Sequence, residues 1–103
     1  MNKNKILSLL GLATKAGKVV SGEFSTEKAV KSGKGLLVVV AEDASDNTKK
    51  KLSNMCHFYE VPMIFVGDKE QLGKCTGKEF RASLAVLDEN FTKAIIKNYP
   101  SQD

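Results

Sequence analysis

The sequence predicts an α/β/α sandwich, in which helices cover both faces of a small, largely parallel or mixed sheet. Two observations predict this fold. Helical and extended patterns alternate along the chain, and the run LLVVVA at residues 36–41 is apolar throughout, which is typical of a strand buried on both faces. The chain has 103 residues and shows no linker, repeat or low-complexity segment. We therefore expect a single domain over residues 1–103, with a loose tail at residues 100–103.

The first half of the chain begins with a helix, a short strand and a second helix. Apolar residues at the spacing i, i+3, i+4, i+7 between Ile6 and Ala13 predict an amphipathic helix that ends before Gly17. The segment KVVSG that follows is expected to be extended. A second helix is expected from Ser25, which can act as its N-cap, and Gly33 is a natural stop for it.

The buried strand at 36–41 ends at EDASD, and a third helix follows. Its N-cap can be any of Asp43, Ser45 and Asp46. Beyond that helix, VPMIFVG at 61–67 predicts the next strand.

A fourth helix and a fifth helix flank the last predicted strand, LAVLD at 84–88. Asp68 and Asp88 are the expected N-caps of these two helices. Pro100 is expected to end the last one, because proline cannot continue a helix.

Positive charge is concentrated in the first half of the chain. The formal net charge is +4, but residues 1–51 contain ten lysines against five acidic residues, and residues 52–103 contain six basic against seven acidic residues. Such an asymmetry predicts a polyanionic partner. The alternative is a lysine-rich surface that only faces water.

The composition argues against export and against a membrane span. The apolar start is interrupted by Ser8, Gly11 and Thr14, and no A-x-A cleavage site follows it. Cys56 and Cys75 fit neither a disulfide framework nor a C-x-x-C pair. We therefore expect a cytoplasmic protein without a membrane anchor.

The sequence contains little that points to catalytic chemistry. The segment GKCTGKE at 73–79 is one residue short of a P-loop and has Glu79 where Ser or Thr must hold magnesium. Cys56 lies on an apolar helical stripe and is expected in the core. No metal site and no cofactor are predicted, which favours a binding module. An enzyme would be favoured if Asp43, Ser45 and His57 converged in one pocket.

The polar segment around the second helix has the features of an anion-binding surface. Three lysines recur every three residues, and the exposed amides of a helical first turn also attract phosphate. Gly22 allows a ligand to approach the backbone closely. The lysines are Lys28, Lys31 and Lys34, and the nearby hydroxyls belong to Ser21, Ser25 and Thr26. This set suits a nucleic-acid backbone; the alternative is an ordinary polar helix whose last lysines complement its dipole.

Four landmarks together resemble the ribosomal L7Ae/L30e family, in particular its bacterial YlxQ-type members. They are G-x-x-x-T-x-K-A-V at 22–30, LLVVVAEDAS at 36–45, VPMIFVGDKEQLGKCTG at 61–77 and SLAVLD at 83–88. The resemblance covers residues 5–96. It implies an L30e-like sandwich with a mixed four-stranded sheet, and a protein that binds kink-turn RNA and performs no chemistry.

The resemblance also implies where RNA is bound. The family's RNA-contacting helix begins at the position of Gly22, its phosphate-facing lysine falls on Lys28, and its second contact loop falls on residues 78–82. The implied RNA-binding residues are Gly22, Glu23, Phe24, Ser25, Thr26, Lys28, Lys31, Lys78, Glu79, Phe80 and Arg81. Family members read sheared G·A pairs with an Asn-Glu or Lys-Gln pair, whereas this chain has Phe24 and Ser25 there.

These two segments are therefore expected to form one basic face, extended over Lys15, Lys18 and Lys34. Lysines and Arg81 would bind phosphates, and Phe24 and Phe80 would stack on bases. The expected protein is a monomer that binds ribosomal or other structured RNA. The alternative is a non-catalytic substrate or protein-interaction domain of the RNA-modification machinery. Both phenylalanines could also be buried against neighbouring helices.

Overall fold

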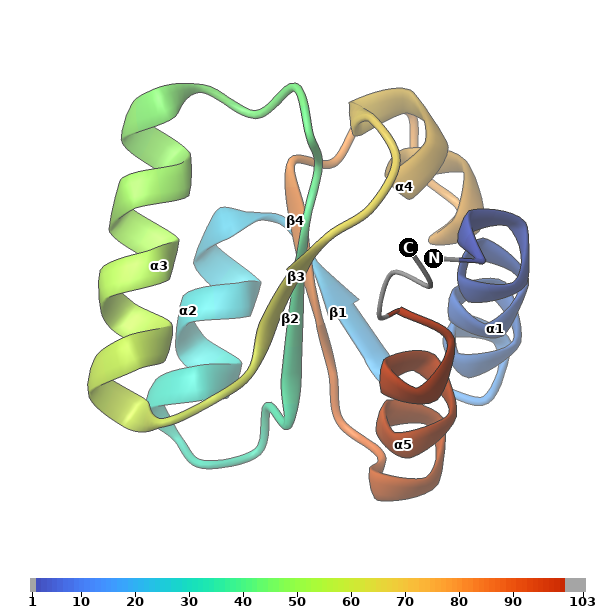
Figure 1. Ribbon diagram of the computed structural model, residues 1–103, viewed down its shortest axis with the longest axis horizontal. Helices are drawn as coiled ribbons and strands as arrows, with labels where there is room; N and C mark the ends of the chain where they lie inside the picture. The colour runs from blue at the N-terminus through green and yellow to red at the C-terminus, as the bar shows by residue number, and fades with distance from the viewer. Residues whose placement is uncertain (1, 100–103) are drawn as a thin grey trace.

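The computed structural model describes residues 2–99, which form five helices and four strands (Figure 1). In chain order these are α1 (Lys3–Lys15), β1 (Val19–Ser21), α2 (Glu23–Lys31), β2 (Leu37–Val40), α3 (Asp46–Tyr59), β3 (Met63–Phe65), α4 (Lys69–Cys75), β4 (Ser83–Val86) and α5 (Glu89–Asn98). The expected end of the last helix at Pro100 and the tail at 100–103 lie outside the described residues.

The strands form one mixed sheet with the order β1-β4-β2-β3. β2 and β3 are parallel, and β4 runs antiparallel to both of its neighbours, β1 and β2. The predicted extended piece KVVSG supplies β1, an edge strand that pairs Val20 with Ala85. The other edge is β3.

Helices pack on both faces of this sheet, which confirms the predicted three-layer sandwich. α2 and α3 cover one face, and α1, α4 and α5 cover the other (Figure 1). Alternate residues of β2 point to opposite faces. Leu37 and Val39 join the core under α1, α4 and α5, whereas Val38 and Val40 join the core under α2 and α3. Because all four are fully buried, β2 is apolar at every position.

Side chains cap three of the helices as the sequence suggested. Of the three candidates for α3, Ser45 is the N-cap: its hydroxyl accepts from the Thr48 amide at 3.2 Å. Asp68 caps α4 in a reciprocal capping box with Gln71, and Asp88 caps α5.

The prediction that Ser25 caps the second helix is wrong. α2 begins two residues earlier, at Glu23, and its N-cap is Gly22. Gly22 has φ +97° and ψ 155°, a conformation that residues with a Cβ rarely adopt, so it can turn the chain directly from β1 into the helix. Ser25 therefore lies inside the first turn.

Within residues 2–99, none of the helices has the length and apolar character needed to cross a bilayer.

Candidate nucleic-acid interface

The start of α2 presents free backbone donors at the surface. The Gly22 amide donates to the Ser83 carbonyl of β4 at 2.9 Å, and the Gly22 carbonyl accepts from the Thr26 amide at 2.9 Å. Among the described residues, no side chain caps this end of the helix. The amides of residues 23–25 therefore lack intrahelical acceptors and, with the helix dipole, favour an anion there.

Arg81 joins the loop between α4 and β4 to the segment that enters α2. Its Nε donates to Ser21 Oγ at 3.1 Å, and one terminal nitrogen donates to the Phe80 carbonyl at 2.8 Å. A Cβ placed on Gly22 would lie 3.8 Å from the same Nε. The structure thus brings together two segments about sixty residues apart in the chain.

Backbone contacts with α4 hold the loop that carries Arg81. The Lys78 amide donates to the Gly73 carbonyl at 2.7 Å, and the Arg81 amide donates to the Lys69 carbonyl at 3.0 Å. The backbone at Glu79 lies so close to Gly73 that any Cβ at position 73 would overlap it. The Lys78 and Glu79 side chains face solvent.

Phe24 and Phe80 are exposed, so the alternative that they are buried is wrong. Phe24 is 77% exposed and Phe80 is 59% exposed. Large apolar side chains on a surface are a common feature of binding sites when polar groups surround them. Here each phenylalanine lies in one of the two segments that Arg81 joins.

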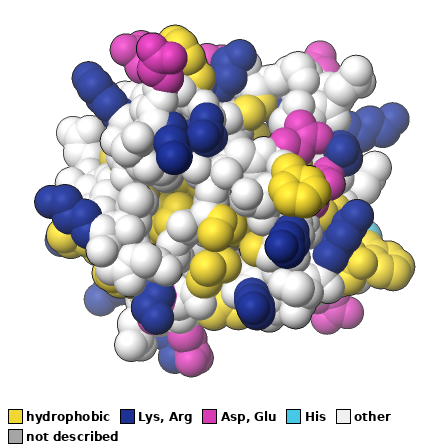
Figure 2. Space-filling model, turned by 180° about the vertical axis from the view of Figure 1, so that it is seen from behind, with side chains coloured by type: hydrophobic (Ala, Val, Ile, Leu, Met, Phe, Trp, Pro, Cys, Tyr) yellow, Lys and Arg dark blue, Asp and Glu magenta, His cyan; other side chains and the backbone are white. Residues whose placement is uncertain are grey.

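We call this surface the basic ridge. Lys28 and Lys31 on α2 are also exposed, and Ser25 is half-buried. In Figure 2, which views the molecule from behind, Lys and Arg side chains lie around exposed apolar side chains. The basic ridge comprises Gly22, Glu23, Phe24, Ser25, Lys28, Lys31, Lys78, Glu79, Phe80 and Arg81.

Lys51 on α3 forms ion pairs with both acidic residues of α2. Its Nζ lies 2.9 Å from Glu23 Oε2 and 2.7 Å from Glu27 Oε2. Hydrogen bonds to Glu27 and then Glu23 raise the pKa of Lys51, so its charge is retained. Lys51 was not among the residues predicted for the site, because its partners lie on another helix and no local sequence pattern links them to it.

Thr26 is not part of the surface, contrary to the prediction from the sequence. It is fully buried, and its Oγ1 accepts a hydrogen bond from Ser83 Oγ at 3.2 Å. Its side chain ties α2 to β4 beneath the site. The position follows from the helix start at Glu23, which turns the fourth residue of the helix toward the sheet.

The residues that would favour an enzyme do not converge. Ser45 and His57 lie near opposite ends of α3, about 18 Å apart along the helix axis. Asp43 accepts from the Lys69 amide at 2.9 Å and so braces the start of α4. Across the residues described, no group of three or more His, Cys, Asp and Glu side chains could hold a metal ion.

Both cysteines are unsuited to nucleophilic chemistry. Cys56 is buried in the core between α3 and the sheet, as predicted, and Cys75 is half-buried. Burial raises the pKa of each thiol from 9.0 to about 11. The thiolate, which is the reactive form, is therefore scarce near neutral pH.

The family model for the ribosomal protein L7Ae/L30e/S12e/Gadd45 family matches residues 4–96. The chain belongs to this family. The resemblance in the sequence is thereby confirmed, and so is the likeness to the YlxQ-type members. The RNA-binding protein YlxQ of Bacillus subtilis (strain 168) is 44% identical over 88 residues, which cover 85% of this chain and 88% of that protein.

The chain is also similar to a ribosomal protein and to a solved structure. The large ribosomal subunit protein eL8 of Cenarchaeum symbiosum (strain A) is 34% identical over 90% of this chain and 75% of its own length. A solved structure of a protein with unknown function from Bacillus halodurans C is 40% identical and superposes with a TM-score of 0.86, covering 90% of this chain and 94% of that one.

Proposed function

We propose that this L7Ae-family chain binds structured, kink-turn-like RNA through the basic ridge and performs no chemistry on it. The contact between Arg81 and Ser21 supports this most directly, because it unites the segments that the family resemblance assigns to RNA. Membership of the family and the name of the Bacillus subtilis relative, an RNA-binding protein, support the class of ligand.

The phosphate backbone supplies most of the binding energy in this proposal. Lys28, Lys31 and Lys78 are exposed cations, and Arg81 carries a guanidinium that can bind phosphate in a bidentate manner. The first-turn amides of α2 add neutral donors beside them. Because Lys51 pairs with both Glu23 and Glu27, these carboxylates repel phosphate less.

Phe24 and Phe80 supply stacking in place of base-edge hydrogen bonds. Each exposed ring can cover an unpaired base, a contact worth about 1–3 kcal/mol. Phe24 cannot donate or accept at a base edge, so Ser25 and the backbone are the polar groups left to read the G·A pairs. We therefore propose that this chain recognises the kinked shape and the splayed bases more than the base pairs themselves.

The proposed setting is a cytoplasmic ribonucleoprotein, with this chain as a monomer associated with the ribosome. The similarity to a large ribosomal subunit protein supports this setting. All residues of the basic ridge come from one chain, so the proposal needs no second copy.

Fluorescence anisotropy with a labelled RNA tests the proposal. The probes are a stem–loop that contains a kink-turn and a fully paired stem–loop of equal length. We expect tighter binding to the kink-turn, with log affinity falling against log salt at a slope of about −3 to −4 for four phosphate contacts. A flat salt dependence would contradict the phosphate-based mechanism, and equal affinity for both RNAs would contradict shape recognition.

Lys97→Ala is the control variant for charge. Lys97 is an exposed lysine on α5, which covers the opposite face of the sheet from α2. Lys97→Ala and Lys28→Ala each remove one positive charge. We expect Lys28→Ala to weaken binding and Lys97→Ala to leave it nearly unchanged.

A further inference from the structure

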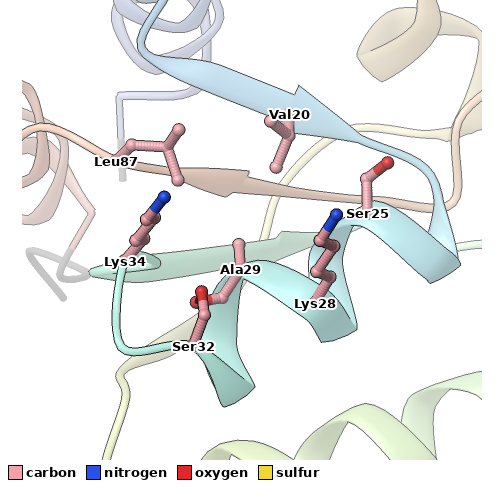
Figure 3. Close-up of a pocket in the computed structure, with 7 residues that line it drawn as sticks. All are labelled: Val20, Ser25, Lys28, Ala29, Ser32, Lys34 and Leu87. Atoms are coloured by element: carbon pink, nitrogen blue, oxygen red, sulfur yellow. Dashed lines mark hydrogen bonds between the residues drawn. The ribbon is translucent and has the colours of Figure 1, made fainter.

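A hollow of about 370 Å³ lies beside α2, on the side that faces β1 and the end of β4 (Figure 3). Its floor is apolar and comes from three elements: Val20 on β1, Ala29 on α2 and Leu87 directly after β4. Val20 and Leu87 are only half-buried, so their side chains leave apolar surface open to solvent. The volume lies in the range of small-molecule sites.

The rim of the hollow is polar and cationic. Lys28 and Lys34 lie near its two ends, and Figure 3 shows both ammonium groups on the strand side of α2. Ser25 and Ser32 add hydroxyl groups to the rim. No Asp or Glu is among the described residues that line it.

This combination fits a nucleotide. A base is flat and largely apolar on its faces, so it can cover the floor, while the phosphates that flank its sugar carry the negative charge that the two lysines complement. A simple anion would leave the apolar floor uncovered.

We propose that the hollow binds one unpaired nucleotide of the RNA strand held on the basic ridge, with its base on the floor and its flanking phosphates at Lys28 and Lys34. The proposal rests on the proposed function and extends it. Ser25 and Lys28 belong to both the basic ridge and the rim of the hollow. A strand that leaves the ridge along α2 therefore passes over the hollow.

Methyl NMR of the full chain with two RNAs tests this directly. One RNA is a kink-turn stem–loop, and the other is the same stem–loop with a single-stranded uridine extension at each end. The methyl groups of Val20 and Leu87 report on the floor, and those of Leu12, exposed on α1, serve as the reference. We expect the extended RNA to shift the Val20 and Leu87 signals, and the stem–loop without extensions to leave them near their free positions.

Lys34→Gln is the variant that separates the hollow from the ridge. At saturating extended RNA it should abolish the Val20 and Leu87 shifts, and it should lower the salt slope for this RNA by about 0.7, as expected for one lost phosphate contact on a single strand. Lys31→Gln removes the same charge from the neighbouring turn but does not line the hollow. It should weaken binding and preserve the methyl shifts at saturation.

The remaining outcomes separate the two proposals. If the extended RNA binds and shifts the Phe24 and Phe80 ring signals but not Val20 and Leu87, the nucleotide site is wrong and the basic ridge stands. If both RNAs shift the floor equally, the occupant is not an unpaired nucleotide. If uridine monophosphate shifts the floor and the extended RNA does not, the site does not belong to an RNA strand. If neither RNA binds, both proposals fail.

Discussion

Arg81 Nε donates to Ser21 Oγ at 3.1 Å across a sequence separation of 60 residues. Ser21 ends β1 and Arg81 precedes β4, the strand that pairs with β1. The antiparallel ladder therefore brings the two residues together, and the hydrogen bond orients the guanidinium beside the start of α2. Two N–H donors of that guanidinium group bind Ser21 and the Phe80 carbonyl, and its remaining donors are available to a ligand.

Replacing Arg81 should weaken RNA binding more than it weakens the fold. We expect Arg81→Ala to lower affinity for the kink-turn stem–loop roughly 10- to 150-fold, the range for a lost hydrogen-bonded charge contact of about 1.5–3 kcal/mol. Arg81→Lys should recover only part of it, because lysine cannot hold Ser21 and bind phosphate with the same planar group. Anisotropy measures affinity, and thermal unfolding checks the fold. If Arg81→Ala bound the RNA as tightly as the parent chain does, Arg81 would not be part of the interface.

Phe24→Ala and Phe80→Ala should each cost about 1–3 kcal/mol of RNA binding through lost stacking. Neither should destabilise the protein much, since the rings are 77% and 59% exposed. Phe58→Ala is the matched control, because Phe58 is also 77% exposed but lies near the end of α3. If all three variants bind RNA as the parent chain does, stacking is not part of the mechanism.

Lys51→Ala should weaken RNA binding although Lys51 itself need not touch the RNA. Without the Lys51 ammonium group, the negative charges of Glu23 and Glu27 are unpaired and repel the phosphate backbone. The loss should be smaller than that of Lys28→Ala and should shrink as salt rises. Adding Glu23→Gln and Glu27→Gln to the variant should restore affinity. Lys50→Ala, at the neighbouring exposed lysine, is the control; an effect as large as that of Lys51→Ala would indicate a general charge effect.

Cys56 and Cys75 should resist alkylation in the folded protein. With a pKa of about 11, each thiol is roughly one part in a thousand ionised at pH 8. Iodoacetamide at pH 8 should label both cysteines far faster in guanidinium chloride than in buffer, as measured by intact mass. Rapid labelling of the native chain would show that the thiols are accessible and unperturbed.

The same shifts predict an alkaline loss of stability. Above about pH 9 the unfolded thiols release protons that the folded thiols keep, so the unfolded state binds fewer protons and the free energy of unfolding falls as pH rises toward 11. A Cys56→Ser, Cys75→Ser variant should lose less stability over this interval in urea unfolding. Parallel losses in both proteins would assign the effect to other groups.

Periodicity and composition were enough to predict the sandwich and its buried central strand. The run that supplies β2 is apolar on both faces, and Ser45, Asp68 and Asp88 have capping chemistry that acts within three residues. Signals that act between near neighbours in the chain can be recognised from the sequence alone. The two segments of the basic ridge, in contrast, were joined by the family resemblance, because no local pattern links residues sixty positions apart.

The predictions from the sequence were wrong or incomplete where backbone geometry or contacts with distant residues determine a residue's position. Ser25 is a good capping residue by type, but the positive φ of Gly22 starts the helix earlier and moves Ser25 inside. That shift also turns Thr26 toward Ser83 and away from the surface. Lys51 pairs with Glu23, 28 residues away in the sequence. It is one of three consecutive lysines, and the sequence does not show which of the three will form the ion pair.

Gly73→Ala should damage both the fold and the proposed RNA site, although alanine has a higher helix propensity than glycine. In an exposed helix, alanine is about 1 kcal/mol more favourable than glycine. At position 73 in α4, however, the new Cβ would overlap the Glu79 carbonyl and crowd the Phe80 amide, so the loop must move. We expect a net loss of about 1–3 kcal/mol in the free energy of unfolding, typical of overpacking. RNA affinity should fall as well, because the same loop carries Phe80 and Arg81.

Gly11→Ala tests whether that loss comes from the overlap. Gly11 also lies inside a helix, α1, but a Cβ there meets only the Cys75 carbonyl at 4.0 Å, an ordinary contact. We expect Gly11→Ala to be neutral or to stabilise the protein by up to about 1 kcal/mol, without changing RNA affinity. Urea unfolding and anisotropy measure the two quantities in both variants. If Gly73→Ala were as stable as Gly11→Ala and bound RNA equally well, the close backbone contact between the loop and α4 would not be what positions Arg81.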